Sequence, residues 1–275
     1  MHSFVFWNIA GKCSLNVVDE AVKHLDADFV IIAEDCLNIN QLLPLLNTNS
    51  RKVYQFRCNN RRRISIYAAT ENGVKIELVS TDNPYILPVQ IITPIQKTLL
   101  IGIHLPSKLR TDNNERQFVS RKVAGEIISI ESRLGHKNTV VVGDFNMNPL
   151  EDGIVSVDAF NAVMSKDIAK KKKGVRKHAG KSYDFFYNPM WGHFGDLSDT
   201  APGTYYYAPS DYKNKYYWNM FDQILIRPSI IDSFDWPYII DEIKVGRTTK
   251  KLLSKGRSFK INESDHLPLF FQIKI

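Results

Sequence analysis

The stretch TVVVGDFN, residues 139–146, joins a short apolar run to two polar side chains, Asp144 and Asn146. A short apolar run of this kind predicts a strand. In α/β folds, the side chains that follow the carboxyl ends of strands form the binding and catalytic sites. We therefore expect Asp144 and Asn146 to lie at the edge of a sheet, within a functional site.

The same arrangement recurs at four other places along the chain. An acid that closes a strand is often only a turn or helix-cap residue, and a single histidine is more often structural or exposed than catalytic. Five such positions with complementary chemistry are a much stronger signal than any one of them. The four further positions are Asn8 after Phe4–Trp7, Glu34 after Phe29–Ala33, His104 after Thr98–Ile103, and Ser264-Asp265-His266 before Leu269–Ile275.

Most of these side chains offer hard oxygen ligands. The carboxylates of Glu34, Asp144 and Asp265 and the amides of Asn8 and Asn146 suit Mg²⁺, which prefers oxygen and keeps several of its waters. Zinc would need histidine and cysteine ligands, and the spacing of the three cysteines does not supply them. The set therefore favours exchangeable Mg²⁺ (or Mn²⁺).

The two histidines complete the chemistry. His104 and His266 can donate hydrogen bonds to a phosphate group or to its transition state. Together with the acids, they favour metal-assisted attack of water on a phosphate ester. The P-loop and the dinucleotide-binding fingerprint, which would indicate other phosphate chemistry, are both absent from the sequence.

Short strands dominate the rest of the chain, with few long helices. We expect helices at Asn16–Leu25 and at Asn114–Leu134, the latter ending at Gly135. The runs Ile64–Ala69 and Val74–Val79 flank the turn Glu71-Asn72-Gly73, which favours a hairpin. Many strands and few helices predict an α/β fold in which two sheets pack face to face under helices. No linker or repeat is visible, so residues 1–275 are interpreted as one domain.

Composition excludes several protein classes. The 275 residues are 44% hydrophobic and 24% charged, which rules out collagen, a coiled coil or whole-chain disorder. Three cysteines without metal-type pairing argue against a disulfide framework. The N-terminus lacks a signal-peptide pattern, and the least charged stretch, Asn83–Gln96, carries three prolines and cannot be a spanning helix. We expect a monomer in the cytoplasm or another intracellular compartment.

The formal charge of +7 is concentrated in three segments, 61–63, 166–181 and 247–260. They hold 17 of the 36 basic residues and only 1 of the 29 acids. Such loops around an acidic body indicate a polyanionic substrate, although lysine-rich loops can also be merely solvated. The segment at about 166–182 is predicted to be a mobile insertion near the same end of the fold as Asp144. Its candidate backbone-binding residues are Lys170, Lys171, Lys172 and Lys173.

Aromatic residues gather between Tyr183 and Trp218, just before the strand Phe221–Ile226. Aromatic rings beside basic loops suit base stacking, which makes Tyr206 and Trp218 candidate substrate-binding residues. Ordinary strand packing is the alternative, because alternate tyrosines of Tyr205–Tyr207 must face inward.

These motifs resemble the endonuclease/exonuclease/phosphatase (DNase I-like) superfamily over nearly the whole chain. The two most specific matches are Gly143–Asn146 and Ser264–His266. Further matches are Trp7–Gly11, Asp28–Glu34, Ile103–Ser107 and Met220–Leu225. The resemblance implies a four-layered αββα sandwich with two packed mixed β-sheets.

The resemblance also implies roles. Glu34 would be the main metal ligand, with Asn8 and Asp265 close by. Asp144 would orient or deprotonate the attacking water, and Asn146 would hold that water or a phosphate oxygen. Asp222 would hydrogen-bond His266, and His266 and His104 would stabilise the transition state.

Three function classes follow. We favour a metal-dependent phosphodiester hydrolase, a nuclease acting on DNA or RNA, because the basic loops and aromatic residues suit nucleic acid. The alternative is a phosphatase or phosphodiesterase that acts on a small phosphorylated molecule or a lipid headgroup, since such substrates are also dense anions. A non-catalytic binding protein is disfavoured, because it would not need Asp144 and His266 together.

Overall fold

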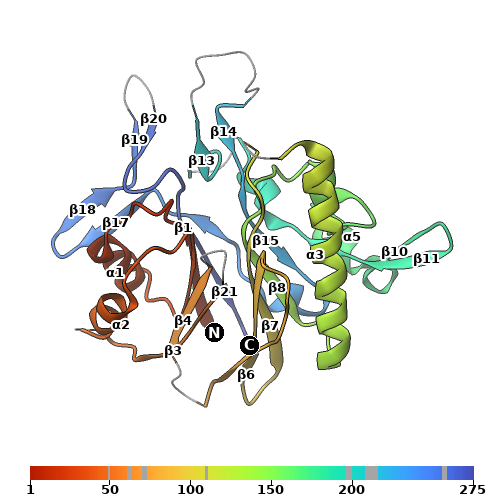
Figure 1. Ribbon diagram of the computed structural model, residues 1–275, viewed down its shortest axis with the longest axis horizontal. Helices are drawn as coiled ribbons and strands as arrows, with labels where there is room; N and C mark the ends of the chain where they lie inside the picture. The colour runs from red at the N-terminus through yellow and green to blue at the C-terminus, as the bar shows by residue number, and fades with distance from the viewer. Residues whose placement is uncertain are drawn as a thin grey trace.

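The computed structural model describes residues 1–48, 50–60, 64–69, 73–108, 111–195, 200–207, 216–255 and 259–275. Two mixed sheets pack face to face between layers of helices, which is the predicted four-layered α/β sandwich (Figure 1). One sheet has the order β16 (Tyr238–Ile239), β21 (Leu269–Ile273), β1 (His2–Asn8), β2 (Phe29–Ala33), β4 (Ser65–Ala69) and β3 (Tyr54–Asn59). The other has the order β5 (Lys75–Leu78), β6 (Ile86–Ile92), β7 (Lys97–His104), β8 (Thr139–Asp144), β15 (Asp222–Ile226), β12 (Phe186–Tyr187) and β9 (Ala162–Val163).

The helices form the outer layers. The first sheet is covered by α1 (Leu15–His24) and α2 (Ile39–Asn47), and the second by α3 (Asn113–Leu134), with the short α4 (Asp152–Val155) and α5 (Lys166–Lys170) nearby (Figure 1). The helix predicted at Asn114–Leu134 is confirmed as α3, and its apolar face packs on the second sheet, where Val123, Ile127 and Ile130 are fully buried. Gly135 ends α3 in the left-handed conformation at φ 73°, as predicted. None of the helices in the described ranges is long and apolar enough to span a membrane.

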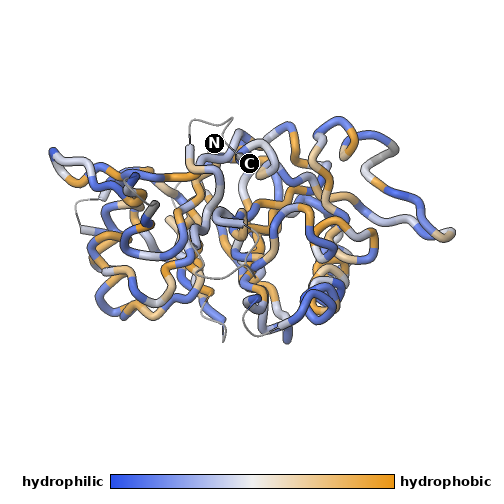
Figure 2. Tube along the Cα trace, turned by 90° about the horizontal axis from the view of Figure 1, so that it is seen from above, coloured by the Kyte–Doolittle hydropathy of each residue, from blue (hydrophilic) through white to orange (hydrophobic). Residues whose placement is uncertain are grey.

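Close approach of the two sheets depends on one glycine. Gly102 lies in β7, and a Cβ placed there would lie 2.9 Å from Cγ2 of Ile64 and 3.2 Å from Cγ2 of Ile31, on the facing sheet. Both contacts are tighter than normal packing allows. The apolar segments run through the two strand layers, whereas the projecting hairpins are largely hydrophilic (Figure 2).

The predicted hairpin between Ile64–Ala69 and Val74–Val79 is wrong. β4 pairs with β2 and β3 in the first sheet, whereas β5 pairs with β6 in the second. Two of the predicted turn residues, Glu71 and Asn72, lie outside the described residues, and the strands they were expected to join belong to different sheets. Alternation of apolar residues predicts a strand but does not select its partner, because both sheets offer a similar apolar face.

The sequence analysis did not predict β6, which lies inside the proline-containing stretch Asn83–Gln96. Proline has no backbone N–H to donate to a neighbouring strand. Pro88 is tolerated in β6 because it lies opposite Val79, one residue past the end of β5. Its carbonyl accepts from the Val79 N–H, and no residue of β5 requires a hydrogen bond from Pro88. The 166–182 segment also has regular structure. It forms α5, the 3₁₀ turn η1 (Lys171–Gly174) and a hairpin of β10 (Val175–His178) and β11 (Lys181–Asp184).

Candidate active site

Strand register brings the polar motif residues to one end of the sandwich. β1 and β2 are parallel, with Asn8 opposite Ala33, so Asn8 and Glu34 end neighbouring strands. In the second sheet, β7 and β8 place His104 directly opposite Asp144. β15 runs antiparallel to β8 and starts at the same end, with Asp222 opposite Asp144. Both termini lie at the other end of the sandwich (Figure 1).

The backbone at these strand ends is unusual. Glu34 and Asn146 adopt positive φ angles of 52° and 51°, which are costly for residues other than glycine. Gly143 must lack a side chain, because a Cβ there would overlap the carbonyl oxygen of Ile103 on the neighbouring strand. Backbone strain at successive motif positions is typical of a site whose side chains must point in specified directions.

Asp144 is the centre of the cluster. Its side chain is 1% exposed and accepts three hydrogen bonds, from Asn8 Nδ2 at 3.0 Å, Asn146 Nδ2 at 3.1 Å and the Asn146 backbone N–H at 2.8 Å. Asn8 also donates to Glu34 at 3.4 Å, so its amide N–H groups orient both acids. Burial raises the pKa of Asp144, although the positive charge on His266 opposes this shift.

His266 is held by a buried acid. Its Nδ1 lies 2.7 Å from Asp222 Oδ2, and both side chains are buried. Burial alone would lower the pKa of His266, but the carboxylates of Asp222, Asp144 and Asp265 outweigh burial and raise the pKa to about 10. His266 is therefore an imidazolium at neutral pH, and its Nε2–H points toward Asp144.

The loop that carries His266 is fixed by further contacts. Ser264 Oγ donates to the Asn8 carbonyl at 2.7 Å, and Trp7 Nε1 donates to the His266 carbonyl at 2.9 Å. Thr204 Oγ1 accepts from the Asp222 N–H at 3.1 Å. No role was predicted for Thr204, because it lies 18 residues before Asp222 in the sequence and contacts it only in the folded chain.

The two histidines face the same carboxylate oxygen. Nε2 of His104 lies 3.8 Å from Asp144 Oδ2 and 3.6 Å from Glu34 Oε1, and Nε2 of His266 lies 4.0 Å from Asp144 Oδ2. These separations exceed a direct hydrogen bond and are the size that a water molecule or a phosphate oxygen bridges.

The site could hold a metal ion. Ligand atoms of Asp144, Asp222 and His266 all lie within 4.8 Å of one another. Oδ1 of Asp222 and Oδ1 of Asp265 are buried and have no hydrogen-bond partner among the described residues, which suits a nearby cation. A protonated imidazole has no free lone pair, so carboxylate oxygens are the better ligands here.

Asp222→Asn should lower the pKa of His266, since it removes the nearest carboxylate. Because the folded-state pKa lies above the usual 6.5, protonation stabilises the fold fully below about pH 6.5, and this stabilisation is lost as pH rises toward 10. An NMR titration of the His266 ring should show the midpoint moving to lower pH in the variant. The ring signals of His178, on an exposed hairpin, serve as the control and should be the same in both proteins. An unchanged His266 midpoint would contradict the role of Asp222.

Comparison with known proteins identifies the fold. No protein-family model matches the sequence, and no curated protein matches it either. Among solved structures, TDP2 from D. rerio complexed with a single-strand DNA product is 19% identical, with a TM-score of 0.54, and the match covers 100% of this chain and 99% of that one. The endonuclease domain of TRAS1, a telomere-specific non-LTR retrotransposon, is 12% identical (TM-score 0.56; 100% and 99% covered). An endonuclease/exonuclease/phosphatase family protein from Bacteroides thetaiotaomicron is 13% identical (TM-score 0.58; 99% and 94% covered).

The chain has the DNase I-like fold. The resemblance inferred from the sequence motifs is thereby confirmed for the architecture. In this DNase I-like sandwich, all eight predicted catalytic and metal-binding residues lie at one end. They are Asn8, Glu34, His104, Asp144, Asn146, Asp222, Asp265 and His266.

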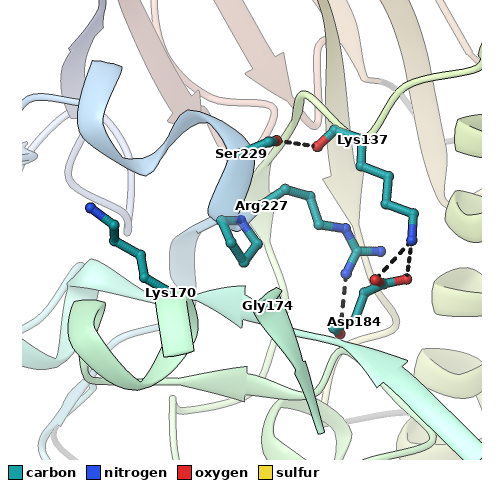
Figure 3. Close-up of a pocket in the computed structure, with 7 residues that line it drawn as sticks. Lys137, Lys170, Gly174, Asp184, Arg227 and Ser229 are labelled. Carbon is teal, nitrogen blue, oxygen red and sulfur yellow. Dashed lines mark hydrogen bonds and ion pairs between the residues drawn. The ribbon is translucent and has the colours of Figure 1, made fainter. Parts of the chain in front are cut away.

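The predicted basic insertion lies at the opposite end of the sandwich. Gly174 packs against Pro228, just past the carboxyl end of β15, whereas Asp222 at the start of β15 marks the site. There Lys170 Nζ is ion-paired with Asp232 at 2.6 Å and lines a pocket of about 330 Å³ with Arg227 and Ser229 (Figure 3). The expectation that this segment emerges beside Asp144 is therefore wrong, because the chain from Asp144 first runs to β9, at the far edge of the second sheet, and the segment begins there.

The other predicted substrate-binding residues either lie away from the site, lie outside the described residues, or pack against each other. Lys171 lies in the same turn as Gly174, and the side chains of Lys172 and Lys173 and all of Arg61–Arg63 lie outside the described residues. Tyr206 and Trp218 pair across a hairpin of β13 (Tyr205–Tyr206) and β14 (Trp218–Asn219), with ring centroids 5.1 Å apart.

The ring that reaches the site is instead Tyr205. Its centroid lies 4.9 Å from that of His266 and 5.2 Å from that of Phe221. Because side chains alternate along a strand, Tyr206 points to the other face of the hairpin. The aromatic composition of this segment was visible in the sequence, but its register was not.

Proposed function

We propose that this chain is a Mg²⁺-dependent phosphodiester hydrolase that acts on nucleic acid. The observation that carries the proposal is the convergence of a buried carboxylate, Asp144, with the Asp222–His266 pair. Asn8, Asn146 and His104 surround the same carboxylate. The D. rerio TDP2 complex and the TRAS1 endonuclease domain, which share the fold, support a nucleic-acid substrate.

Asp144 is suited to activate water. Its three hydrogen bonds fix the carboxylate, and its raised pKa makes it a stronger base near neutral pH than an exposed aspartate. A water between Asp144 Oδ2 and the two Nε2 atoms would lie within reach of all three groups. Asp144 takes the proton of that water as it attacks the phosphorus.

The histidines are suited to stabilise developing negative charge. The His266 imidazolium, held by Asp222, directs Nε2–H into the site, and His104 approaches the same position from the second sheet. A preorganised charged donor such as the His266 imidazolium stabilises a phosphoryl transition state more than its ground state. His266 or His104 then assists the departing oxygen.

Glu34 is the residue we assign as the main metal ligand. It is partly exposed, is oriented by Asn8, and lies at the rim of the cluster close to Asp144 and His104. A bound Mg²⁺ would supply positive charge to the phosphate. Asp265 is the second candidate ligand, because its buried Oδ1 lies 3.9 Å from His266 Nε2 and has no hydrogen-bond partner among the described residues.

Glu34→Gln should raise the Mg²⁺ concentration that gives half-maximal activity by at least about tenfold, since even outer-sphere changes cost that much at metal sites. The measurement is cleavage of plasmid, single-stranded DNA and RNA across a Mg²⁺ and Mn²⁺ series, with EDTA as the blank. The matched control is Glu77→Gln. Glu77 is a partly exposed acid on β5 that pairs with Lys75, and its variant should behave like the wild type. Full activity in excess EDTA would refute metal dependence.

The same panel tests the alternative. A phosphatase or phosphodiesterase for a small phosphorylated molecule would hydrolyse a phosphomonoester or headgroup analogue and leave all three nucleic acids intact. Our proposal is supported if nucleic acid is cleaved and the phosphomonoester is not hydrolysed.

A further inference from the structure

One face of the β13–β14 hairpin carries tyrosine rings that begin at His266. Tyr205 bridges to His266 and pairs with Asn219 across the hairpin. The ladder continues outward, because the Tyr207 N–H donates to the Tyr217 carbonyl at 2.9 Å. Residues two apart on a strand share a face and lie about 7 Å apart, so Tyr207 and Tyr217 extend the face that Tyr205 begins.

The outer two rings are open to solvent. Tyr207 is 50% exposed and Tyr217 is 62% exposed. Neither ring has an aromatic or cationic partner among the described residues. Flat, exposed rings that lead out of a phosphate site are suited to stack on unpaired bases, since every base presents a π-face.

A basic hairpin lies next to the β13–β14 hairpin. β20 (Phe259–Ile261) lies next to β13 and pairs with β19 (Leu253–Lys255), and the two hairpins project together at the site end (Figure 1). Lys255 and Lys260 are exposed on opposite faces of this hairpin, and neither has a carboxylate partner among the described residues.

The basic hairpin is fixed to the loop that carries the site. Asn262 anchors it through its N–H to the Leu252 carbonyl at 2.7 Å and its Nδ2 to the Lys251 carbonyl at 3.1 Å. Lys250 pairs with Glu263 at 2.7 Å, and Ser264 and His266 follow directly. The position of these lysines relative to His266 is therefore set by a short, hydrogen-bonded segment.

We infer that the two hairpins form a subsite for an unpaired nucleic-acid strand that runs outward from the site. Tyr207 and Tyr217 stack on its bases. Because Lys255 and Lys260 lie on opposite faces of the neighbouring hairpin, one of the two contacts its phosphates. This inference deepens the proposed function and rests on it for the identity of the substrate. It assigns the backbone contacts to the 247–260 basic segment, which lies at the site end, instead of the 166–181 segment.

Binding of a 5′-fluorescent single-stranded oligonucleotide, measured by anisotropy in EDTA, tests the subsite without turnover. Tyr207→Ala/Tyr217→Ala should weaken binding at least about fivefold, because one lost base stack has at least that effect. Tyr207→Phe/Tyr217→Phe should restore it, since stacking does not need the hydroxyl. Binding of a blunt duplex should not change in either variant.

Lys255→Ala/Lys260→Ala should reduce the slope of log affinity against log salt by about 0.7, the value for one lost phosphate contact with a single strand. The matched control is Lys177→Ala/Lys181→Ala, which removes two exposed lysines from the β10–β11 hairpin away from the site and should leave the slope unchanged. Wild-type single-strand affinity in the tyrosine-to-alanine variant, or an equal slope change in the control, overturns the inference. The proposed function fails separately, if the wild type binds the oligonucleotide but hydrolyses no nucleic acid with Mg²⁺ or Mn²⁺.

Discussion

Asp144→Asn is expected to lower kcat by about 10²–10⁴, because it removes the group that takes a proton from the attacking water. KM should change little, since Asp144 is 1% exposed and lies beneath the surface that meets the substrate. The measurement is steady-state cleavage of the preferred oligonucleotide, with thermal unfolding to confirm the fold. Asp144→Ala provides a second variant without a replacement amide.

Asp152→Asn is the matched control for this prediction. Asp152 is an exposed acid eight residues further along the same segment, at the start of α4. It should retain wild-type kinetics. If both Asp144 variants fold and keep the wild-type kcat, water activation must be assigned to another group.

His266→Ala is expected to lower kcat by about 10²–10³, the typical effect of removing one transition-state donor from a preorganised site. It also leaves Asp222 as an unpaired buried acid, so the variant will lose stability. His266→Gln keeps a neutral donor toward Asp222 and separates the catalytic effect from the structural one. Asp222→Asn should reduce kcat less than His266→Ala, because the imidazole remains but is less well oriented and less fully protonated.

A double variant tests whether the two groups act together. Asp144→Asn combined with His266→Gln should reduce kcat by much less than the product of the single effects, since both groups act on one transition state. His178→Ala, on the exposed β10–β11 hairpin, serves as the histidine control and should be silent. Simple multiplication of the two effects would show that the groups serve independent steps.

Local pattern found eight of the thirteen strands that the structure describes in the two large sheets and the polar residues at the ends of those strands. Phe29–Ala33 was predicted with its observed bounds, and Thr139–Val142 extends by only two residues, to Asp144. Apolar periodicity reports burial directly, and polar residues interrupt it where a strand leaves the core. β6 was not predicted because it contains Pro88. The sequence does not show that Pro88 lies past the end of the β5–β6 ladder, where a proline is tolerated.

The site was predictable for the same reason. Parallel neighbouring strands end at the same edge of a sheet, so Asn8 and Glu34 in one sheet, and His104 and Asp144 in the other, were bound to be brought together once the strands were paired correctly. Asp222 was predicted as a site residue only from the family resemblance. Its strand, β15, runs antiparallel to β8, so Asp222 lies at the start of a strand and not at the end of one. The structure also supplied the partner of His104, since Glu34 lies on the facing sheet.

The sequence by itself determined which residues end strands, which carry charge, and which chemistry the polar set can perform, because these are properties of local pattern and residue type. The tertiary structure decided which sheet β5 joins, which tyrosine lies against His266, and which basic segment stands near the site. Strand pairing, register and the ends of the sandwich are long-range properties, set by packing between segments far apart in the chain. Lys170 and Lys260 both lie in lysine-rich segments, and the sequence does not show which of the two segments is near the site. That depends on the direction in which each segment leaves the sheets.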